Sequence, residues 1–256
     1  MPNRETVLVI PAAGAGTRLQ SDTPKVLSAV NGRPMIDHLL DRYRNTVQRF
    51  VLVVHPSFAS RVREHVKSAA PNLHVEYAQQ PAPTGMLDAI LVASDQVAAS
   101  RPDRVWITWC DQVGVHPHTV ATLSRMSAEH RDVPIVLPTS RQADPYIHLE
   151  RDGDGRIVAI RQRREGDAMP AIGESDMGLF SLSSDAYFDL LPQFGRETTE
   201  ARGTRERNFL PFVPWLTSHG QGVVTFPSTN EMEAIGVNTP DDRHRLEHYL
   251  RELERR

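Results

Sequence analysis

Residues 9–27, VIPAAGAGTRLQSDTPKVL, combine a stretch of small residues with two cations, a combination that suits the binding of a phosphate anion. Small side chains let a ligand reach the backbone amides, which can form a nest for phosphate oxygens after a strand. Arg18 can hold terminal phosphates bidentately, and Lys25 can act as a point charge. Such a pair suits a triphosphate whose charge is redistributed during reaction. The candidate nest comprises Ala12, Ala13, Gly14, Ala15, Gly16 and Thr17.

The two commonest phosphate-binding motifs do not fit this stretch. Leu19 occupies the position of the third glycine in the dinucleotide motif G-x-G-x-x-G. The P-loop would need a lysine directly after its last glycine, and none is there. The pattern that remains is G-x-G-x-R-x₅-P-K, and the alternative interpretation is a glycine turn with two solvated cations.

This pattern resembles the signature of the sugar-phosphate nucleotidyltransferase family, the NDP-sugar pyrophosphorylase type, and is similar to the N-acetylglucosamine-1-phosphate uridylyltransferase domain. It also resembles the small cytidylyltransferases of isoprenoid and alditol pathways, to which the opening at 11–14, Pro-Ala-Ala-Gly, is similar. The resemblance implies a Rossmann-like nucleotidyltransferase fold. It also implies transfer of a nucleotidyl group from UTP or CTP to a phosphorylated or phosphonate small-molecule acceptor, with release of pyrophosphate and with Arg18 and Lys25 as catalytic residues.

The segment QPAPTGMLDA, residues 80–89, resembles the part of the family that reads the pyrimidine base. Gln80 and Gly85 fall on the base-reading positions. An amide side chain offers both a donor and an acceptor, so Gln80 could pair with uracil or with cytosine. Met86 and Leu87 depart from the threonine and glycine that the family has there. The alternative for Gln80 is a polar loop residue.

Two oxygen donors far apart in the chain are candidate ligands for Mg²⁺. Asp111 follows the apolar run 104–109, at the end of a strand where open α/β sheets bind their ligands. Asn238 lies in EAIGVNTPDD, which resembles the family's G-V-N segment. The resemblance implies that both residues hold one Mg²⁺, an ion that accepts oxygen donors and keeps water. As alternatives, Asp111 could cap a helix and Asn238 could belong to a turn.

The acceptor side departs from the family pattern. Gln162 and Asp176 stand where the sugar-nucleotide enzymes have a glutamate and an asparagine that hold sugar hydroxyls, and Gly178 follows in the same segment. These exchanges favour an altered acceptor. The arginines at 161, 163 and 164 could neutralise a compact anionic acceptor, although a solvated strand end is the simpler interpretation.

The pattern of apolar residues predicts an α/β fold with a mixed, mostly parallel sheet flanked by helices. We expect a single nucleotidyltransferase domain over 1–256, with a nucleotide-binding half (1–140), an acceptor-binding half (141–238) and a C-terminal helix (239–256). The predicted strands are 6–10, 50–54, 73–77, 104–109, 133–137, 146–150, 155–163, 176–183 and 222–226. The predicted helices are 34–46, 57–69, 85–99 and 117–130, besides the C-terminal one.

Three segments have no assigned chemistry. Segments 163–175 and 195–207 are rich in charge and glycine and are interpreted as either lids or disordered surface. In segment 205–216, the apolar residues predict core packing. We interpret His116 and His118 as the entry to a helix and 152–156 as a hairpin turn.

A net charge of −3 at 256 residues argues against a nucleic-acid or membrane-surface partner, which would want a basic excess. Cys110 is the single cysteine, which excludes an internal disulfide and fits a reducing compartment, so we expect a cytoplasmic protein. The oligomeric state is not predicted. Three hypotheses remain: a uridylyl or related transferase onto a sugar 1-phosphate, a cytidylyltransferase acting on a non-sugar phosphate or phosphonate, and an inactive nucleotide-binding regulatory protein.

Overall fold

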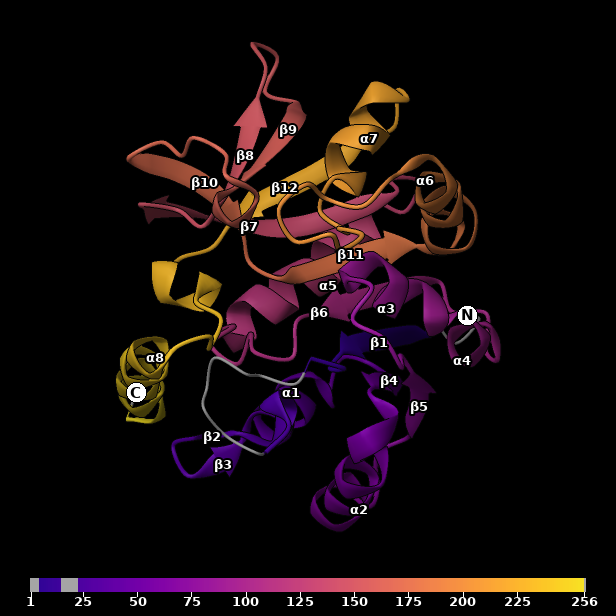
Figure 1. Ribbon diagram of the computed structural model, residues 1–256, viewed down its shortest axis with the longest axis vertical. Helices are drawn as coiled ribbons and strands as arrows, with labels where there is room; N and C mark the ends of the chain where they lie inside the picture. The colour runs from indigo at the N-terminus through magenta and orange to yellow at the C-terminus, as the bar shows by residue number, and fades with distance from the viewer. Residues whose placement is uncertain (1–4, 15–22, 256) are drawn as a thin grey trace.

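The computed structural model describes residues 5–14 and 23–255, and their centre is an eight-stranded sheet with helices on both faces (Figure 1). The strands follow the order β10-β7-β11-β6-β1-β4-β5, and β12 pairs with β7. The strands of this sheet are β1 Thr6–Pro11, β4 Arg49–Val54, β5 Val75–Gln79, β6 Arg104–Thr108, β7 Ile135–Ala143, β10 Ile172–Asp176, β11 Leu179–Ser183 and β12 Val223–Pro227.

Parallel and antiparallel pairs divide the sheet. The pairs β1–β4, β1–β6, β4–β5 and β7–β12 are parallel, whereas β11 runs antiparallel to both of its neighbours and β10 antiparallel to β7. The predicted mixed, mostly parallel sheet is therefore confirmed. β11 lies between β6 and β7, so these two strands, which are consecutive in the sequence, are separated in the sheet.

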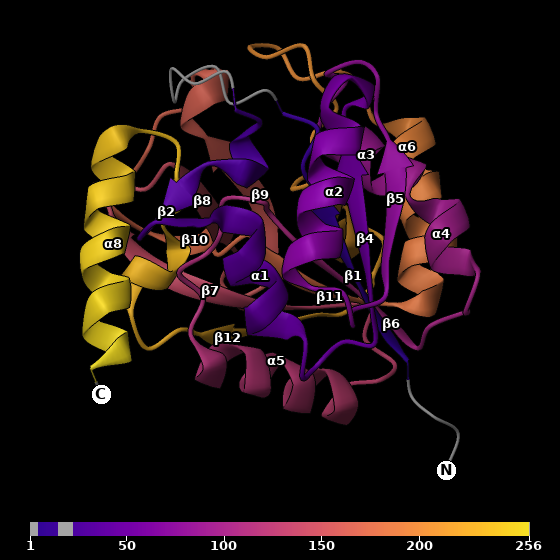
Figure 2. The ribbon, with the colours of Figure 1, turned by 90° about the horizontal axis from the view of Figure 1, so that it is seen from below.

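Helices cover the two faces of the sheet as two separate layers. They are α1 Met35–Tyr43, α2 Ala59–Ala69, α3 Met86–Val92, α4 Ser94–Ala98, α5 Pro117–Glu129, α6 Leu191–Glu197, α7 Phe212–Ser218 and α8 Pro240–Glu254. One layer holds α1, α2, α5 and α8, and the other holds α3, α4, α6 and α7. Figure 2 shows α8 at one side of the molecule and α4 and α6 at the opposite side.

The strand β1 shows why its sequence is apolar throughout. Successive side chains of a strand point to opposite faces of the sheet. Leu8 and Ile10 pack in the cluster under α1, and Val7 and Val9 pack in the cluster under α3. Because both faces are covered, these positions are all occupied by apolar residues.

Shorter elements complete the chain. They are the hairpins β2 Ala29–Val30 with β3 Arg33–Pro34 and β8 Ile147–Arg151 with β9 Ile157–Gln162, the 3₁₀ turns η2 Lys25–Leu27, η3 Pro56–Phe58, η4 Arg163–Glu165 and η6 Glu231–Ala234, and the π-helical turn η5 Ala186–Leu190. The predicted hairpin turn at 152–156 joins β8 to β9 and is confirmed. Among the described residues, every helix is too short or too polar to cross a lipid bilayer.

Most predicted elements are present, but several of their boundaries need correction. The strand expected at 133–137 is the longer β7, Ile135–Ala143. The strand expected at 176–183 is two strands, because β10 ends at Asp176 and β11 begins at Leu179. The predicted helix 85–99 divides at Ala93, whose N–H bonds the carbonyl of Ile90, so that the last turn of α3 tightens. The strand expected at 73–77 begins two residues later, at Val75. These differences are in element boundaries, which local pattern specifies weakly.

Two helices begin with the capping groups expected from sequence. His116 is the N-cap of α5 and its ring accepts a hydrogen bond from the N–H of His118, so the helix-entry interpretation is confirmed. Thr239 caps α8 in a reciprocal capping box with Asp242, and Pro240 takes the first helical position. This cap fixes the direction in which the chain leaves Asn238.

Candidate active site

Lys25, Asp111 and Asn238 meet at the carboxyl end of β6. The Lys25 ammonium forms an ion pair with the Asp111 carboxylate and donates a hydrogen bond to Asn238 Oδ1 at 2.9 Å. Lys25 begins the turn η2 after Pro24, and Asp111 follows β6. The structure thus brings Lys25 together with two residues that lie 86 and 213 positions away from it in the sequence.

Backbone contacts hold the two oxygen donors in place. The Val237 N–H donates to the Asp111 carbonyl at 3.2 Å, which ties the segment before α8 to the end of β6. A Cβ on Gly236 would lie 3.2–3.3 Å from the Asp111 carboxyl group, so glycine permits this approach. Asn238 Nδ2 donates to the Gly236 carbonyl at 3.3 Å, which turns Oδ1 toward Lys25.

The donor set fits a divalent cation. One carboxylate and one amide oxygen, both held by backbone contacts, are oxygen ligands of the kind that Mg²⁺ binds together with water and phosphate. A cation, the Lys25 ammonium, already lies against both donors. The electrostatics of the position are therefore suited to positive charge, and Asp111 and Asn238 are the residues that would hold the metal ion.

The phosphate nest is described only at its start. Ala12 is buried and its N–H donates to the Val53 carbonyl at 2.7 Å. This amide therefore belongs to the sheet and is not available to a phosphate, in contrast to the prediction. Ala13 and Gly14 follow, and a Cβ on Gly14 would meet nothing within 4 Å. Four further candidates, Ala15, Gly16, Thr17 and Arg18, lie outside the described residues.

Gln80 and Gly85 lie together at the end of β5. Gln80 is buried, and its Nε2 donates to Thr84 Oγ1 at 3.2 Å and to the Gly85 carbonyl at 3.0 Å. The amide nitrogen is thus used within the loop, and the oxygen is the atom left to accept from an N–H of a ligand. The orientation of an amide is assigned from its hydrogen bonds, and here the Gly85 carbonyl, which can only accept, identifies the atom that faces it as the nitrogen.

Gly85 is required by the chain itself. Its φ is +118°, and a Cβ would lie 2.4 Å from the Arg207 carbonyl oxygen. The Arg207 N–H donates to the Thr84 carbonyl at 2.8 Å, and the Arg207 carbonyl accepts from the Leu87 N–H at 3.1 Å. The close approach therefore joins the candidate base-reading loop to the segment before α7, a relationship that sequence reasoning missed.

Gln162, at the end of β9, belongs to a buried chain of amides. Its Oε1 accepts from Asn208 Nδ2 at 3.1 Å, and Asn208 Oδ1 accepts from the Arg164 guanidinium at 2.6 Å. Asn208 was missed because segment 205–216 was interpreted as core packing. That interpretation is correct for Phe209, which is buried, but the one amide in the run faces Gln162.

The three neighbouring arginines differ in what they contact. Arg161 pairs with Glu150 at 2.8 Å and Arg163 pairs with Asp144, and both pairs lie at the surface. Arg164 alone of the three bonds inward, to Asn208. The solvated strand end expected from sequence is thus found for two of the arginines, and the third contributes to the amide chain.

The two charged segments interpreted as lids or disordered surface contact each other through Glu165. Its carboxylate accepts from the Gly203 N–H at 2.7 Å and from Thr204 Oγ1 at 2.9 Å. Burial acts to raise the pKa of Glu165, but these hydrogen bonds, together with the charge of Arg164, outweigh it and the pKa is lowered. Segment 163–175 also contributes η4 and most of β10, so much of it is regular structure.

Gly178 lies against Trp109, two residues before Asp111, and Asp176 is bonded to Gly178. Asp176 is 6% exposed, and its Oδ2 accepts from the Gly178 N–H at 2.8 Å. Burial raises the pKa of Asp176 to about 6, against the lowering effect of that bond. Gly178 has φ +60°, and a Cβ there would lie 2.4 Å from Trp109 Cδ1. The indole thus covers the glycine, and sequence reasoning had given Trp109 no role.

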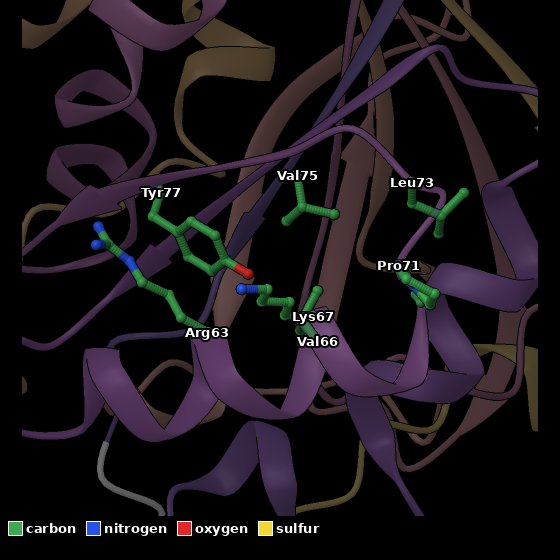
Figure 3. Close-up of a pocket in the computed structure, with 8 residues that line it drawn as sticks. Arg63, Val66, Lys67, Pro71, Leu73, Val75 and Tyr77 are labelled. Atoms are coloured by element: carbon green, nitrogen blue, oxygen red, sulfur yellow. The ribbon is translucent and has the colours of Figure 1, made fainter.

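A separate cavity of about 360 Å³ lies between α2 and β5 (Figure 3). The Arg63 guanidinium lies over the Tyr77 ring, 4.9 Å from its centroid, and Lys67 lines the same cavity. The remaining lining is apolar, and none of the site residues described above contributes to it. The cavity is therefore distinct from the Lys25–Asp111–Asn238 centre, and no chemistry is assigned to it.

The fold and the position of the centre define a class of protein. A mostly parallel sheet covered on both faces, with charged residues gathered at the carboxyl end of β6, is a Rossmann-like nucleotidyltransferase architecture. Residues 8–183 match the model of the MobA-like NTP transferase domain. The chain belongs to this family, which makes it a nucleotidyltransferase domain and confirms the predicted relationship to the sugar-phosphate nucleotidyltransferases.

Curated relatives support the same assignment. The chain is 29% identical over 259 residues to the bifunctional protein GlmU of Kineococcus radiotolerans, an alignment that covers 100% of this chain and 50% of that protein. It is 29% identical over 243 residues to GlmU of Aromatoleum aromaticum, which covers 94% of this chain and 50% of that protein. It is 37% identical over 176 residues to GlmU of Cupriavidus necator, which covers 67% of this chain and 37% of that protein. The chain thus spans about half the length, or less, of these relatives.

Proposed function

We propose that this domain transfers a nucleotidyl group from a pyrimidine nucleoside triphosphate, UTP or CTP, to a phosphorylated or phosphonate small molecule and releases pyrophosphate. The observation that carries the proposal is the convergence of Lys25, Asp111 and Asn238 at the carboxyl end of β6. Membership of the NTP transferase family supports the reaction class. The curated relatives named bifunctional protein GlmU align over 94–100% of this chain in two of the cases given above.

The reaction needs little acid–base assistance. A phosphate or phosphonate oxygen is largely ionised at neutral pH and can attack the α-phosphorus directly. As the new P–O bond forms, the bond to the β-phosphate oxygen breaks and pyrophosphate leaves. The work left to the protein is alignment and the neutralisation of charge.

Each residue of the proposed site has a defined task. Lys25 neutralises the α-phosphate and the incoming oxyanion. Asp111 and Asn238 would hold Mg²⁺, which would supply further positive charge at the phosphates. The backbone of 13–17 and the Arg18 guanidinium bind the β- and γ-phosphates. Gln80 and Gly85 read the pyrimidine, for which the amide oxygen of Gln80 accepts an N–H of the base.

A second candidate is a cytidylyltransferase that acts on a non-sugar phosphate or phosphonate. It is favoured by Gln162 and Asp176. Gln162 stands where the sugar-nucleotide enzymes have a glutamate, and Asp176 stands where they have an asparagine. The two candidates share the transfer centre and differ in base and acceptor.

Two measurements test the proposed function. Thermal stabilisation by each of the four nucleoside triphosphates with Mg²⁺ identifies the base, since a ligand that binds the native state raises apparent stability. Pyrophosphate release is then followed with a panel of sugar phosphates, alkyl phosphates and phosphonates. Binding of UTP or CTP together with pyrophosphate release supports the proposal. Tight binding without turnover on any acceptor would favour the inactive regulatory alternative, and absence of nucleotide binding would refute both.

A further inference from the structure

Asp176 ends β10 and is connected through backbone contacts to the proposed transfer centre. It pairs in register with Thr139 of β7, and β11 begins three residues after it. The Trp109 backbone N–H donates to the Gly178 carbonyl at 3.0 Å, and Trp109 lies two residues before Asp111. The Asp176 carboxylate is therefore attached, through Gly178 and Trp109, to the same strand end as the proposed metal ligand.

The Asp176 carboxylate is buried, and no cation of the described part of the chain pairs with it. Within residues 5–14 and 23–255, no Lys, Arg or His side chain forms an ion pair with it, and its hydrogen bond comes from the backbone N–H of Gly178. Glu174, two residues earlier on β10, shows the contrast, because Arg151 binds both of its oxygens at 2.6 Å. One carboxylate of the strand thus has its counter-charge in the described chain and the other does not.

An uncompensated buried carboxylate is costly, and proteins retain such groups where a ligand supplies the missing charge. Burial raises the pKa of Asp176 to about 6, so the group is still mostly ionised at neutral pH. A hydroxyl-bearing ligand would satisfy the hydrogen bond but not the charge. A ligand with a positive group would satisfy both.

The neighbour of Asp176 suits a cation as well. The Trp109 indole is only half-buried, and it packs against Phe180 and Phe209 with ring centroids 5.2 and 5.9 Å away. These contacts fix the ring beside Gly178, and the face of an indole attracts an ammonium group. The Asp176 carboxylate is bonded to Gly178, and the tryptophan ring covers the same glycine. A buried carboxylate and an indole on one residue are a pair of groups that favours a cation over a neutral hydroxyl.

We infer that the acceptor of this domain is a zwitterion, a phosphate or phosphonate that also carries an ammonium group, and that Asp176 with Trp109 binds this ammonium group. The inference rests on the proposed function, since it names the acceptor class for that reaction. The phosphate or phosphonate oxygen of the acceptor attacks the α-phosphorus beside Lys25 and pyrophosphate leaves, and the ammonium group of the acceptor takes no part in bond making. Asp176 is thus a specificity-determining residue for the acceptor.

The test uses pairs of acceptors that differ only in the amine. 2-Aminoethyl phosphate is compared with 2-hydroxyethyl phosphate, and glucosamine 1-phosphate with glucose 1-phosphate, each with the Mg–nucleotide that the base panel selects. For the wild-type protein we expect kcat/KM to favour the amine in at least one pair by on the order of 10-fold or more, mainly through KM. In Asp176→Asn the preference should fall to about one, because asparagine keeps the Gly178 hydrogen bond and removes the charge.

A matched control and a binding measurement make each outcome decisive. Asp154→Asn changes an exposed aspartate of the β8–β9 turn in the same way and should leave the preference unchanged. The same acceptors are also titrated by calorimetry into protein saturated with a non-hydrolysable Mg–nucleotide, so that selection is measured without turnover. The inference would be overturned if kcat/KM for the hydroxyl acceptors equalled or exceeded that for the amines in both pairs. It would also be overturned if Asp176→Asn lowered kcat/KM equally for both members of a pair. In either case, nucleotide binding and transfer would still support the proposed function. Absence of nucleotide binding would instead refute the proposed function, and the inference with it.

Discussion

Lys25 and Asp111, 86 positions apart in the sequence, form an ion pair, and the same ammonium group of Lys25 donates a hydrogen bond to Asn238 Oδ1. The Lys25 and Asp111 side chains are only 15% and 13% exposed, so their mutual attraction is screened less than at the surface. The ammonium of Lys25 thus contacts both of the side chains that are proposed to hold a divalent ion. The same residue is proposed to meet the α-phosphate during transfer, and these two tasks lead to separate predictions.

Removal of the Lys25 charge should slow transfer without abolishing nucleotide binding. We expect Lys25→Met to lower kcat by on the order of 10²-fold or more, as with loss of one donor that stabilises a transition state. Pyrophosphate release measures the rate, and thermal stabilisation by the Mg–nucleotide confirms that the variant still binds. A near-normal rate would remove Lys25 from the catalytic assignment.

The same variant should bind a free divalent ion more tightly. In Lys25→Met no ammonium group of residue 25 competes with a metal ion for the Asp111 and Asn238 oxygens. We therefore expect the affinity for Mn²⁺ in the absence of nucleotide to rise by on the order of 10-fold. Mn²⁺ binding is measured by electron paramagnetic resonance in the absence of nucleotide. Lys67→Met, which removes an exposed charge from α2, is the control. An unchanged affinity in Lys25→Met would show that Lys25 and the metal ion do not compete.

Gly85 should be intolerant of any side chain. Its φ is +118°, and a Cβ there would lie only 2.4 Å from the Arg207 carbonyl oxygen, so we expect Gly85→Ala to lower the free energy of unfolding by about 2 kcal/mol or more. Urea unfolding measures the change. Gly153→Ala is the control, because a Cβ at that turn meets nothing within 4 Å. Similar stabilities of the two variants would contradict the close approach of Arg207 to the loop.

Asn208 should matter for both stability and the acceptor. Asn208→Ala leaves the buried Gln162 oxygen and the Arg164 guanidinium without their shared partner, which we expect to cost about 1–3 kcal/mol. With Gln162 no longer held, KM for the acceptor should rise while KM for the nucleotide changes little. Chemical unfolding and steady-state kinetics measure the two effects, with exposed Asn72→Ala as the reference. A rise in both KM values by the same factor would indicate general damage instead.

The pKa of Asp176 predicts how its substitution changes stability with pH. Its value in the folded protein, about 6, lies above the usual 3.8, so the native state holds the proton more tightly than the unfolded chain. The stability that Asp176 contributes is therefore fully present below pH 3.8 and is lost as the pH rises through about 6. Asparagine does not titrate, so the free energy of unfolding of Asp176→Asn, relative to wild type, should rise with pH across this range.

The expected gain is at most about 3 kcal/mol, because a shift of one pKa unit corresponds to about 1.4 kcal/mol. Urea unfolding at about pH 5 and about pH 8 measures the difference in each condition. Asp154→Asn, at an exposed turn, should show a difference that does not vary with pH. A flat profile for Asp176→Asn as well would mean that the buried carboxylate does not have the raised pKa.

Short-range pattern determined much of this protein from the sequence. The run at 6–10 is rich in apolar residues because β1 is covered on both faces, and such a run predicts a buried strand. Thr239, Pro240 and Asp242 specify the start of α8 through bonds within a single turn. The family resemblance depends on similarly local motifs, which is why Lys25, Asp111 and Asn238 could be named before their positions were known.

Tertiary structure alone decided which distant groups share a partner. Nothing in the pattern of β11 says that it lies between β6 and β7, because strand order depends on which edges remain free when the sheet forms. The need for glycine at 85 comes from Arg207, and the role of Asn208 comes from Gln162, each across a fold that brings together residues far apart in sequence. Asp176 is the clearest example. Its residue type is visible in the sequence, but its burial without a cation among the described residues depends on packing. That packing determines both the pKa of Asp176 and the ligand that it would select.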